Sequence, residues 1–460
     1  MAGVFPIAAY AAELDGGQLS VWWAVPFAGL LLSIAFLPLA APLFWHHHFG
    51  KISLAWALAF LLPCAAVFGI ATAAGGAVHA FAAEYIPFII LLTSLFVVAG
   101  GICVRGNLRG TPLLNTGLLA LGTVLASFMG TTGASMLMIR PLIRANDNRK
   151  HAVHIVVFFI FLVANAGGSL TPLGDPPLFL GFLKGIDFFW TVKHMFWEAL
   201  FLCTSLLVIF YLLDSYYYRN REEQLPPAMD PTPDSALRIE GKVNFFFLAA
   251  IVGLVLMSGF WKSGVTFPVF GTDVELQNLI RDVLLIAVTI ASLALTPRTA
   301  RSGNDFSWGP MQEVAKLFAG IFITIIPVIA MLRAGEDGAF SAVVRAVTDN
   351  DGQPIDAMYF WATGILSSFL DNAPTYLVFF NTAGGDPATL MTTLASTLAA
   401  ISCGAVFMGA NSYIGNAPNL MVKAIAEERG IKMPSFFGYM AWSCIVLVPL
   451  FIAMTFLFFR

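Results

Sequence analysis

Long apolar stretches separated by short polar ones run through almost the whole chain. Several of them reach the roughly 20 residues that a helix needs to cross a hydrocarbon core, and none shows the alternation of a membrane barrel strand. The pattern therefore predicts an all-α polytopic membrane protein. We expect about ten transmembrane helices, at residues 21–44, 51–75, 85–104, 151–183, 189–213, 244–261, 279–296, 314–333, 388–422 and 435–459.

Four apolar segments are interrupted by Gly, Pro and small polar residues. Segments 112–145 and 357–387 carry the interruption near the middle, which favours re-entrant hairpins. Segments 151–183 and 388–422 are expected to be interrupted helices. The four interruptions read "ASFMGTTGASMLM" (126–138), "NAGGSLTPLGDPPLFLGF" (165–182), "SSFLDNAPTYLVFFN" (367–381) and "GANSYIGNAPNLMV" (409–422).

The chain contains an internal repeat. "SFMG" starts at position 127 and "SFLD" at 368, while "LGDPP" starts at 173 and "IGNAP" at 414, so both pairs differ by the same 241 residues. Five spans and one hairpin fall in each half, and an odd number of spans reverses the orientation of the second half. We therefore expect a first inverted repeat at 1–213, a charged, Pro-rich linker at 214–243 and a second inverted repeat at 244–460.

Composition narrows the class of protein further. Hydrophobic residues make up 58% of the chain and charged residues 11%, against about a quarter charged in an average soluble domain. The net charge of −3 and the scattered Lys and Arg argue against a nucleic-acid partner. The five cysteines lie far apart in apolar stretches, as core residues do, and indicate neither disulfides nor a metal site. We expect no cofactor.

The distribution of Lys and Arg predicts the orientation in the membrane. With the N-terminus outside, most basic residues fall in inner turns, including the linker, whereas the outer loop at 336–356 is mainly acidic. The first twenty residues lack a charged start and a cleavage pattern, so the first span is expected to be retained. We expect a multi-pass protein of the inner (plasma) membrane with a cytoplasmic linker.

The four interruptions have a common chemistry. Gly and Pro break the helical hydrogen-bond ladder, and freed backbone groups at membrane depth are tolerated only beside protein or a watery cavity. The interruptions should therefore face one another. Asp175, Asn372 and Asn416, each followed closely by Pro, and Thr131 or Thr132 are expected to cap new helix starts. Broken helices at matching positions of two inverted halves point to the substrate site of a secondary transporter.

Several side chains at the interruptions are candidates for binding a substrate or ion. Asp175 and Asp371 lead, because ionisable groups at membrane depth are costly, although both could be structural caps only. The asparagines could equally be hydrogen-bonding contacts between helices. The full set of candidates is Asp175, Asp371, Asn372, Thr131, Thr132, Thr171, Asn165, Thr375, Asn411, Ser412, Asn416 and Asn419, with the two aspartates as ligands of a transported Na⁺.

Other conspicuous residues receive simpler interpretations. The three histidines at 46–48 are expected in a turn facing headgroups rather than at a metal. Arg140 and Arg144 are expected to extend to the inner surface, with a gate or counter-ion role for Arg140 as the alternative. Arg281 and Asp282 are expected to form an interfacial pair.

At the four interruptions the sequence resembles the ion transporter superfamily, in particular NhaD-type sodium/proton antiporters and CitMHS-like citrate transporters. "GGSLTPLGDPP" is similar to the family's Gly-Gly and Gly-Asp signature, and "FLDNAPTYLV" to its Asp-Asn-x-Pro hairpin tip. Pro176 and Pro177 replace the Thr run of NhaD members, and "GNAPNLMV" looks more like the anion-transporting relatives. The resemblance implies a homodimer and elevator-type alternating access, in which 112–213 and 357–460 move against a scaffold.

Two functions follow as hypotheses. The first is Na⁺/H⁺ antiport, in which carboxylate oxygens bind the two ions alternately. The second is uptake of citrate or another carboxylate anion at the converging helix starts, coupled to H⁺ or Na⁺. The cation hypothesis is preferred because no Lys or Arg is expected within the interruptions. An intramembrane hydrolase or a channel is a remote alternative, since no HExxH or GxSxG motif occurs, and we expect a transporter rather than an enzyme.

Overall fold

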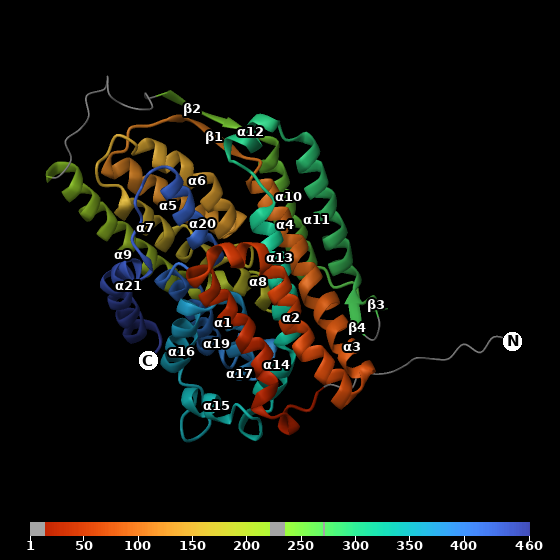
Figure 1. The fold of residues 1–460 in the computed structure, drawn as a ribbon. Coiled ribbons are helices and arrows are strands. Elements are labelled where there is room, and N and C mark those ends of the chain that lie inside the picture. The colour runs from red at the N-terminus through yellow and green to blue at the C-terminus, as the bar shows by residue number, and fades with distance from the viewer. Residues whose placement is uncertain (1–13, 221–234, 270–271) are drawn as a thin grey trace.

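The computed structural model describes residues 14–220, 235–269 and 272–460. They form an all-α polytopic membrane protein with two short two-stranded sheets outside the helical body (Figure 1). Within the described residues, nine helices are long and apolar enough to cross a membrane, or up to ten if a bent pair is counted as one. The fold class expected from the apolar pattern is therefore confirmed.

The described part of the first half contains helices α1–α9, the π-helical segment η3 and, within the first broken helix, the 3-10 turn η4. Their bounds are α1 Val25–Ala40, α2 Pro42–Phe68, α3 Ile70–His79, η3 Ala80–Tyr85, α4 Ile86–Ala99, α5 Pro112–Met129, α6 Thr131–Ala145, α7 Val153–Leu162, η4 Ala166–Leu170, α8 Pro176–Leu183 and α9 Trp190–Asn220.

The second half contains the remaining helices and the 3-10 turn η7. Their bounds are α10 Val243–Phe260, α11 Leu276–Leu295, α12 Arg298–Gly303, α13 Gly309–Thr324, α14 Ile326–Arg333, α15 Ser341–Val347, α16 Asp356–Phe369, α17 Asn372–Thr382, α18 Pro387–Met391, α19 Ala395–Met408, η7 Gly409–Asn411, α20 Ala417–Glu428 and α21 Phe436–Phe458. Strands β1 (Cys103–Asn107) and β2 (Ser235–Glu240) pair antiparallel, as do β3 (Thr266–Val269) and β4 (Thr272–Glu275).

Some helix ends differ from the expected ones. The chain turns at Gly69, whose φ of +92° suits Gly, and then continues helically from Ile70 to Ala99 instead of starting a span at 85. Hydropathy cannot locate this turn because both sides are equally apolar. The expected span at 314–333 bends by 42° between α13 and α14. Helix α9 continues past 213 to Asn220, and the linker residues 221–234 lie outside the described residues.

The helix breaks lie where the interruptions were found. The first hairpin turns at Gly130, between α5 and α6, and the second between α16 and α17. The stretch 151–183 contains α7 and α8 with the 3-10 turn η4 between them. The stretch 388–422 contains α19 and α20 with η7 between them, preceded by the short α18. In Figure 1 the first hairpin lies in the half of the molecule near β1 and β2, and the second in the opposite half.

The same hydrogen bonds recur in both halves at the 241-residue offset. The Thr171 hydroxyl donates to the Ser127 carbonyl, and the Ser412 hydroxyl donates to the Ser368 carbonyl. Each hydroxyl also accepts a backbone N–H two residues later, at 3.2 Å in both halves. Repeated contacts of this kind support the internal repeat at the level of single atoms.

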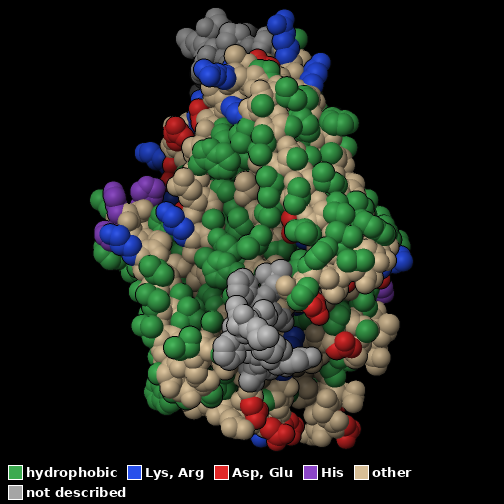
Figure 2. Space-filling model, turned by 90° about the vertical axis from the view of Figure 1, so that its right-hand side faces the viewer, with side chains coloured by type: hydrophobic (Ala, Val, Ile, Leu, Met, Phe, Trp, Pro, Cys, Tyr) green, Lys and Arg blue, Asp and Glu red, His purple; other side chains and the backbone are tan. Residues whose placement is uncertain are grey.

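The helices pack into two groups. One group contains α1–α4, α10, α11, α13 and α14, and the other contains α5–α9, α16, α17 and α19–α21. The groups touch at several places, among them α4 with α6 and α14 with α17. Hydrophobic side chains cover the middle of the molecule in Figure 2, whereas most Lys and Arg lie toward the upper end and the lower end carries mainly Asp and Glu.

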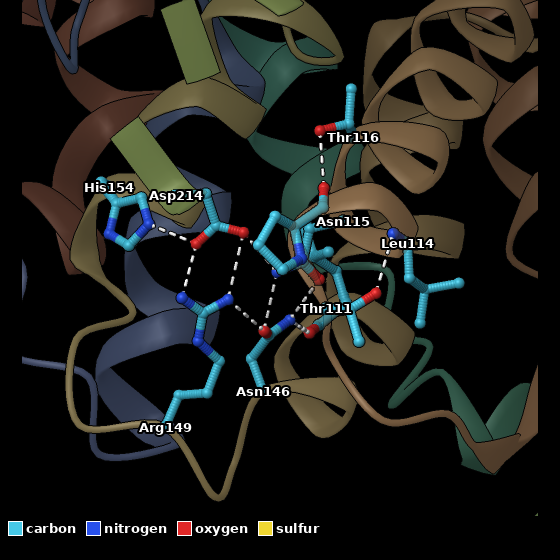
Figure 3. Close-up of polar contacts among 10 residues, drawn as sticks. Thr111, Leu114, Asn115, Thr116, Asn146, Arg149, His154 and Asp214 are labelled. Atoms are coloured by element: carbon cyan, nitrogen blue, oxygen red, sulfur yellow. Dashed lines mark hydrogen bonds and ion pairs between the residues drawn. The ribbon is translucent and has the colours of Figure 1, made fainter. Parts of the chain in front are cut away.

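A buried ion pair anchors the end of α9 in the second group (Figure 3). Asp214 is fully buried and accepts hydrogen bonds from Arg149 at 2.6 Å, from His154 at 2.8 Å and from the Asn115 amide at 3.0 Å. Asn115 also exchanges amide hydrogen bonds with Asn146. Asp214, expected at the start of the linker, is instead part of α9 and ties this helix to the first hairpin.

Candidate ion and substrate site

A cavity of about 1200 Å³ lies between the two helix groups. One wall belongs to α1, α2, α4 and α13, and the other to α6, α8, α17 and α20. Its lining runs from exposed residues at the starts of α2 and α13, such as Lys51 and Ser307, to the helix breaks at Asp175 and Asp371. The cavity therefore connects the polar interruptions with the surface of the molecule.

The Asp175 carboxylate is the point where all three other interrupted segments meet. Asp175 is 2% exposed. Its Oδ1 accepts from the Thr131 hydroxyl at 2.9 Å and from the Asn416 amide at 3.1 Å, and its Oδ2 accepts from the Asn372 amide at 2.5 Å. These donors come from the first hairpin, the second broken helix and the second hairpin. All three donors are neutral, so the carboxylate holds the breaks together without a bonded cationic side chain.

Close backbone contacts hold the Asp175 segment in place. The Thr131 backbone N–H donates to the Gly174 carbonyl at 2.8 Å. A Cβ at Gly174 would lie 2.2 Å from the Gly168 carbonyl oxygen, and Gly415 in the second half stands in the same relation to Gly409, at 2.5 Å. Only glycine permits this approach, which brings each broken helix back on itself beside a hairpin tip.

Asp371 occupies a different position from Asp175. It is the N-cap of α17, its carboxylate accepts from the Ala373 N–H at 3.0 Å, and it lines the cavity while partly exposed. This bond caps the helix, which is the structural role that the sequence analysis allowed for Asp371. Cavity exposure also leaves carboxylate oxygen accessible to a ligand.

Two of the expected helix caps are wrong. Asn372 is the first residue of α17, not its cap, because Asp371 takes that role and Asn372 turns to Asp175. Neither Thr131 nor Thr132 caps α6, since the chain reverses at Gly130, with a φ of +79° and no side chain to contribute. Asn416 and Asp175 do occupy N-cap positions, but neither side chain bonds to its own helix start.

The amide oxygen of Asn372 is the one orphan acceptor beside Asp175 among the described residues. Asn372 is 1% exposed and lines the cavity, and its Oδ1 has no hydrogen-bond partner. Its amide nitrogen is committed to Asp175, which fixes the orientation of the group. A buried acceptor without a partner is costly, so this oxygen is a natural ligand for a cation or proton donor.

The other asparagines mainly join the broken helices. Asn165 and Asn419 are fully buried, and the Asn165 amide donates to Asn419 Oδ1 at 2.7 Å. Asn419 in turn donates to the Gly409 and Ser412 carbonyls, both at 2.9 Å. Asn411 donates to the Ser368 hydroxyl at 2.9 Å. These bonds agree with the alternative role given to the asparagines in the sequence analysis, which was to join helices by hydrogen bonds.

The hydroxyl candidates divide in the same way. Thr131 and Thr132 line the cavity, whereas the hydroxyls of Thr171 and Ser412 bond to backbone at the hairpins. The Thr375 hydroxyl donates to the Asp371 carbonyl at 3.0 Å. Ser127 and Ser368 were not among the predicted site residues. The sequence could have indicated them, because they are the first residues of the repeated tetrapeptides SFMG and SFLD.

The exposed rim of the cavity carries basic side chains that were not predicted as part of the site. His46, His47, Lys51 and Lys316 all line it. The histidines lie in helix α2 rather than in the expected turn, and His47 Nδ1 is 2.8 Å from the Leu43 carbonyl. No cluster of three or more His, Cys, Asp or Glu side chains suited to a metal occurs in the described parts of the chain.

Arg140 was expected to extend to the inner surface, but the structure buries it. It is 8% exposed, and its Nε lies 3.3 Å from Asp305 Oδ2, in the segment between α12 and α13. Arg281 is likewise 1% exposed and pairs with Asp282 at 2.8 Å inside the first helix group. In both cases a carboxylate nearby allows an arginine to remain buried, which hydropathy alone cannot show.

The helix starts offer few backbone donors to an anion. Pro176 and Pro177 occupy the first two positions of α8 and have no N–H. At the start of α17 the Ala373 N–H is already bonded to Asp371. The start of α8, beside Asp175, therefore offers no backbone donor at its first two positions.

Comparison with known proteins places these features in a family. Residues 16–459 match the model of a family described as "Putative citrate transport". The chain is also 22% identical over 345 residues to a protein of Synechocystis sp. named uncharacterized transporter slr0753. The aligned region covers 69% of this chain and 71% of that protein.

Proposed function

The chain belongs to this citrate-transport family, and from that premise we propose that it is a secondary active transporter exchanging Na⁺ for H⁺ at Asp175. The single observation that carries the proposal is the Asp175 carboxylate, which is 2% exposed and bonded to three neutral donors where the cavity meets the helix breaks. A carboxylate so placed gains a counter-charge only when a cation or proton enters.

The oxygen atoms around Asp175 suit a hard cation. Na⁺ would be bound by Asp175 and the orphan Asn372 Oδ1, with Thr131 and Asp371 at the edge of the site. A proton bound to Asp175 removes the charge that attracts the cation. Competition for the same oxygens therefore couples the two ions without a separate switch.

The grouping of the helices supports transport by movement of one group against the other. The cavity lies between the groups, and the four breaks belong to the group made of 112–213 and 357–460. Elevator-type movement of this group would expose Asp175 to each side in turn. We further propose that the protein works as a homodimer in the inner membrane, with the scaffold formed by the other group.

The proposal is tested by reconstitution into liposomes that contain a pH-sensitive dye. Addition of Na⁺ or Li⁺ should move protons, whereas Asp175→Asn and Asp371→Asn should lower the initial rate at least about tenfold, as expected for loss of a charged ligand. Asp386→Asn, on the exposed cap of α18, is the matched control and should retain the rate. Sodium-driven proton movement that survives in Asp175→Asn would refute the proposed site.

Transport of a carboxylate such as citrate is the second candidate. The family description favours it, as do the size of the cavity and its basic rim at His46, His47, Lys51 and Lys316. Opposing it are the carboxylates at the cavity end and the two prolines at the start of α8, which have no N–H to offer an anion. Two results together would select this function: radiolabelled citrate accumulates in the same liposomes, and Na⁺ moves no protons when citrate is left out.

A further inference from the structure

The cavity ends inside the molecule, and polar side chains join the two helix groups beyond that end. On α8 the lining stops at Phe179 and on α17 at Asn372. Further along the same two helices stand Lys184 and Asn381, which do not line the cavity. Both residues belong to the second helix group, and each bonds to a side chain of the first group.

The first contact is an ion pair between Lys184 and Glu84. Their side chains are only 19% and 12% exposed. Glu84 belongs to the π-helical segment η3 of the first group, and Lys184 follows directly after α8, the half-helix that begins at Asp175. Pi-helical segments occur frequently at functional sites. A short rigid helix thus connects the candidate ion site to this pair.

The second contact joins α14 to the second hairpin. Arg333 Nε donates to Asn381 Oδ1 at 2.9 Å, and Asn381 is fully buried. Arg333 closes α14, which leads to α15 at the end of the molecule opposite β1 and β2 (Figure 1). The Arg333–Asn381 contact therefore lies away from the linker.

The internal repeat provides a counterpart at the linker end. Positions 140 and 381 differ by the same 241 residues, and Arg140 bonds to Asp305 of the first group as Asn381 bonds to Arg333. In each contact the repeat residue is buried, whereas its partner in the first group, Asp305 or Arg333, is exposed. The two ends of the molecule thus carry equivalent contacts between the helix groups.

We propose that Glu84–Lys184 and Arg333–Asn381 form a two-point closure, which holds the helix groups together opposite the linker and must open before the site can face that side. The inference rests on the proposed transport function, because only a transporter needs a second opening. The ion pair is suited to the task, since its charges attract each other when closed and become hydrated when open. Opening and closing therefore differ by a small free energy.

Cysteine reactivity tests the closure without any assumption about the substrate. A cysteine at Leu332, which is 3% exposed on α14 next to α17, should react slowly with a membrane-impermeant maleimide. In Glu84→Gln and Lys184→Gln the rate should rise about fivefold, as loss of a partly exposed ion pair favours opening. Lys423→Gln, which breaks an exposed pair inside α20, is the control and should not change it.

A cross-link provides the complementary measurement. A short cleavable thiol reagent joining cysteines at 84 and 184 should abolish ion flux reversibly, while a cysteine at Leu317 in the cavity wall stays reactive. Equal Leu332→Cys reaction rates in the parent and both charge variants, or full flux in the cross-linked protein, would overturn the closure. Absence of Na⁺/H⁺ exchange in the parent protein would overturn the proposed function only, because the labelling rates do not depend on it.

Discussion

At the scale of single residues, the internal repeat makes the candidate site chemically asymmetric. Asp175 and Asn416 occupy equivalent positions, as do Thr131 and Asn372, yet only one carboxylate is present in this set of four. The Asn416 amide donates to Asp175 at 3.1 Å, so the two equivalent side chains meet. These four positions thus hold one negative charge where strict symmetry would place two, which would repel each other.

This asymmetry predicts that the carboxylate can be moved across the site. Asp175→Asn alone should remove sodium-dependent flux. The double variant Asp175→Asn/Asn416→Asp should recover it to within about tenfold, because the oxygens remain within reach of the same cation. Flux is measured with the pH dye at varied Na⁺ concentration, with Asp386→Asn as control. A double variant as inactive as the single one would show that the position of the charge, and not only its presence, matters.

At the scale of elements, each break depends on glycine at a particular place. Gly130 joins the two arms of the first hairpin with φ +79° and ψ +150°, a region almost restricted to glycine. The neighbouring Thr131 bonds through its backbone to Gly174 and through its side chain to Asp175. The geometry of this turn therefore sets the position of one donor to the candidate site.

Substitution of this glycine should weaken both the fold and the transport rate. Gly130→Ala should cost about 1–3 kcal/mol through backbone strain. Gly117→Ala is the matched control on the exposed face of α5, where an added Cβ meets nothing within 4 Å. The control should gain up to about 1 kcal/mol from helix propensity. Thermal unfolding in detergent measures both, and equal melting temperatures would contradict the role of Gly130.

At the scale of the whole molecule, the charge distribution bears on orientation. In Figure 2 most Lys and Arg lie toward the upper end, where some Asp and Glu also occur, whereas the lower end carries mainly Asp and Glu; the upper end is the one with β1 and β2 in Figure 1. This asymmetry is what the rule of positive inner loops requires. The whole end of the molecule near β2 is therefore predicted to face the cytoplasm, as is the linker.

Labelling from the two sides of the membrane tests this orientation. Arg238→Cys, exposed in β2, should react with an impermeant thiol reagent only after the cells are broken or the vesicles inverted. Asp351→Cys, exposed in the loop before α16, should react in intact cells. The opposite pattern would invert the predicted topology and place the cavity opening outside.

The four breaks and their meeting could be predicted from sequence because Gly, Pro and amide side chains are costly in lipid and are easily recognised among apolar residues. The repeat at a constant offset then paired the breaks of the two halves. The cap at Asp371 in place of Asn372 could not be predicted, since adjacent Asp and Asn are both good caps. Local preference does not decide between them, whereas the contact of Asn372 with Asp175 does.

The sequence by itself thus determined that this chain spans a membrane and interrupts four apolar segments, and it predicts an inverted repeat. These properties follow from local composition and period, which hydrophobicity controls. Only the tertiary structure decided that Asp175 has three neutral partners, that Arg140 and Arg281 are buried beside carboxylates, and that Glu84 meets Lys184. Such pairings join residues far apart in the chain, or depend on which way a helix faces, so packing of the two helix groups sets them.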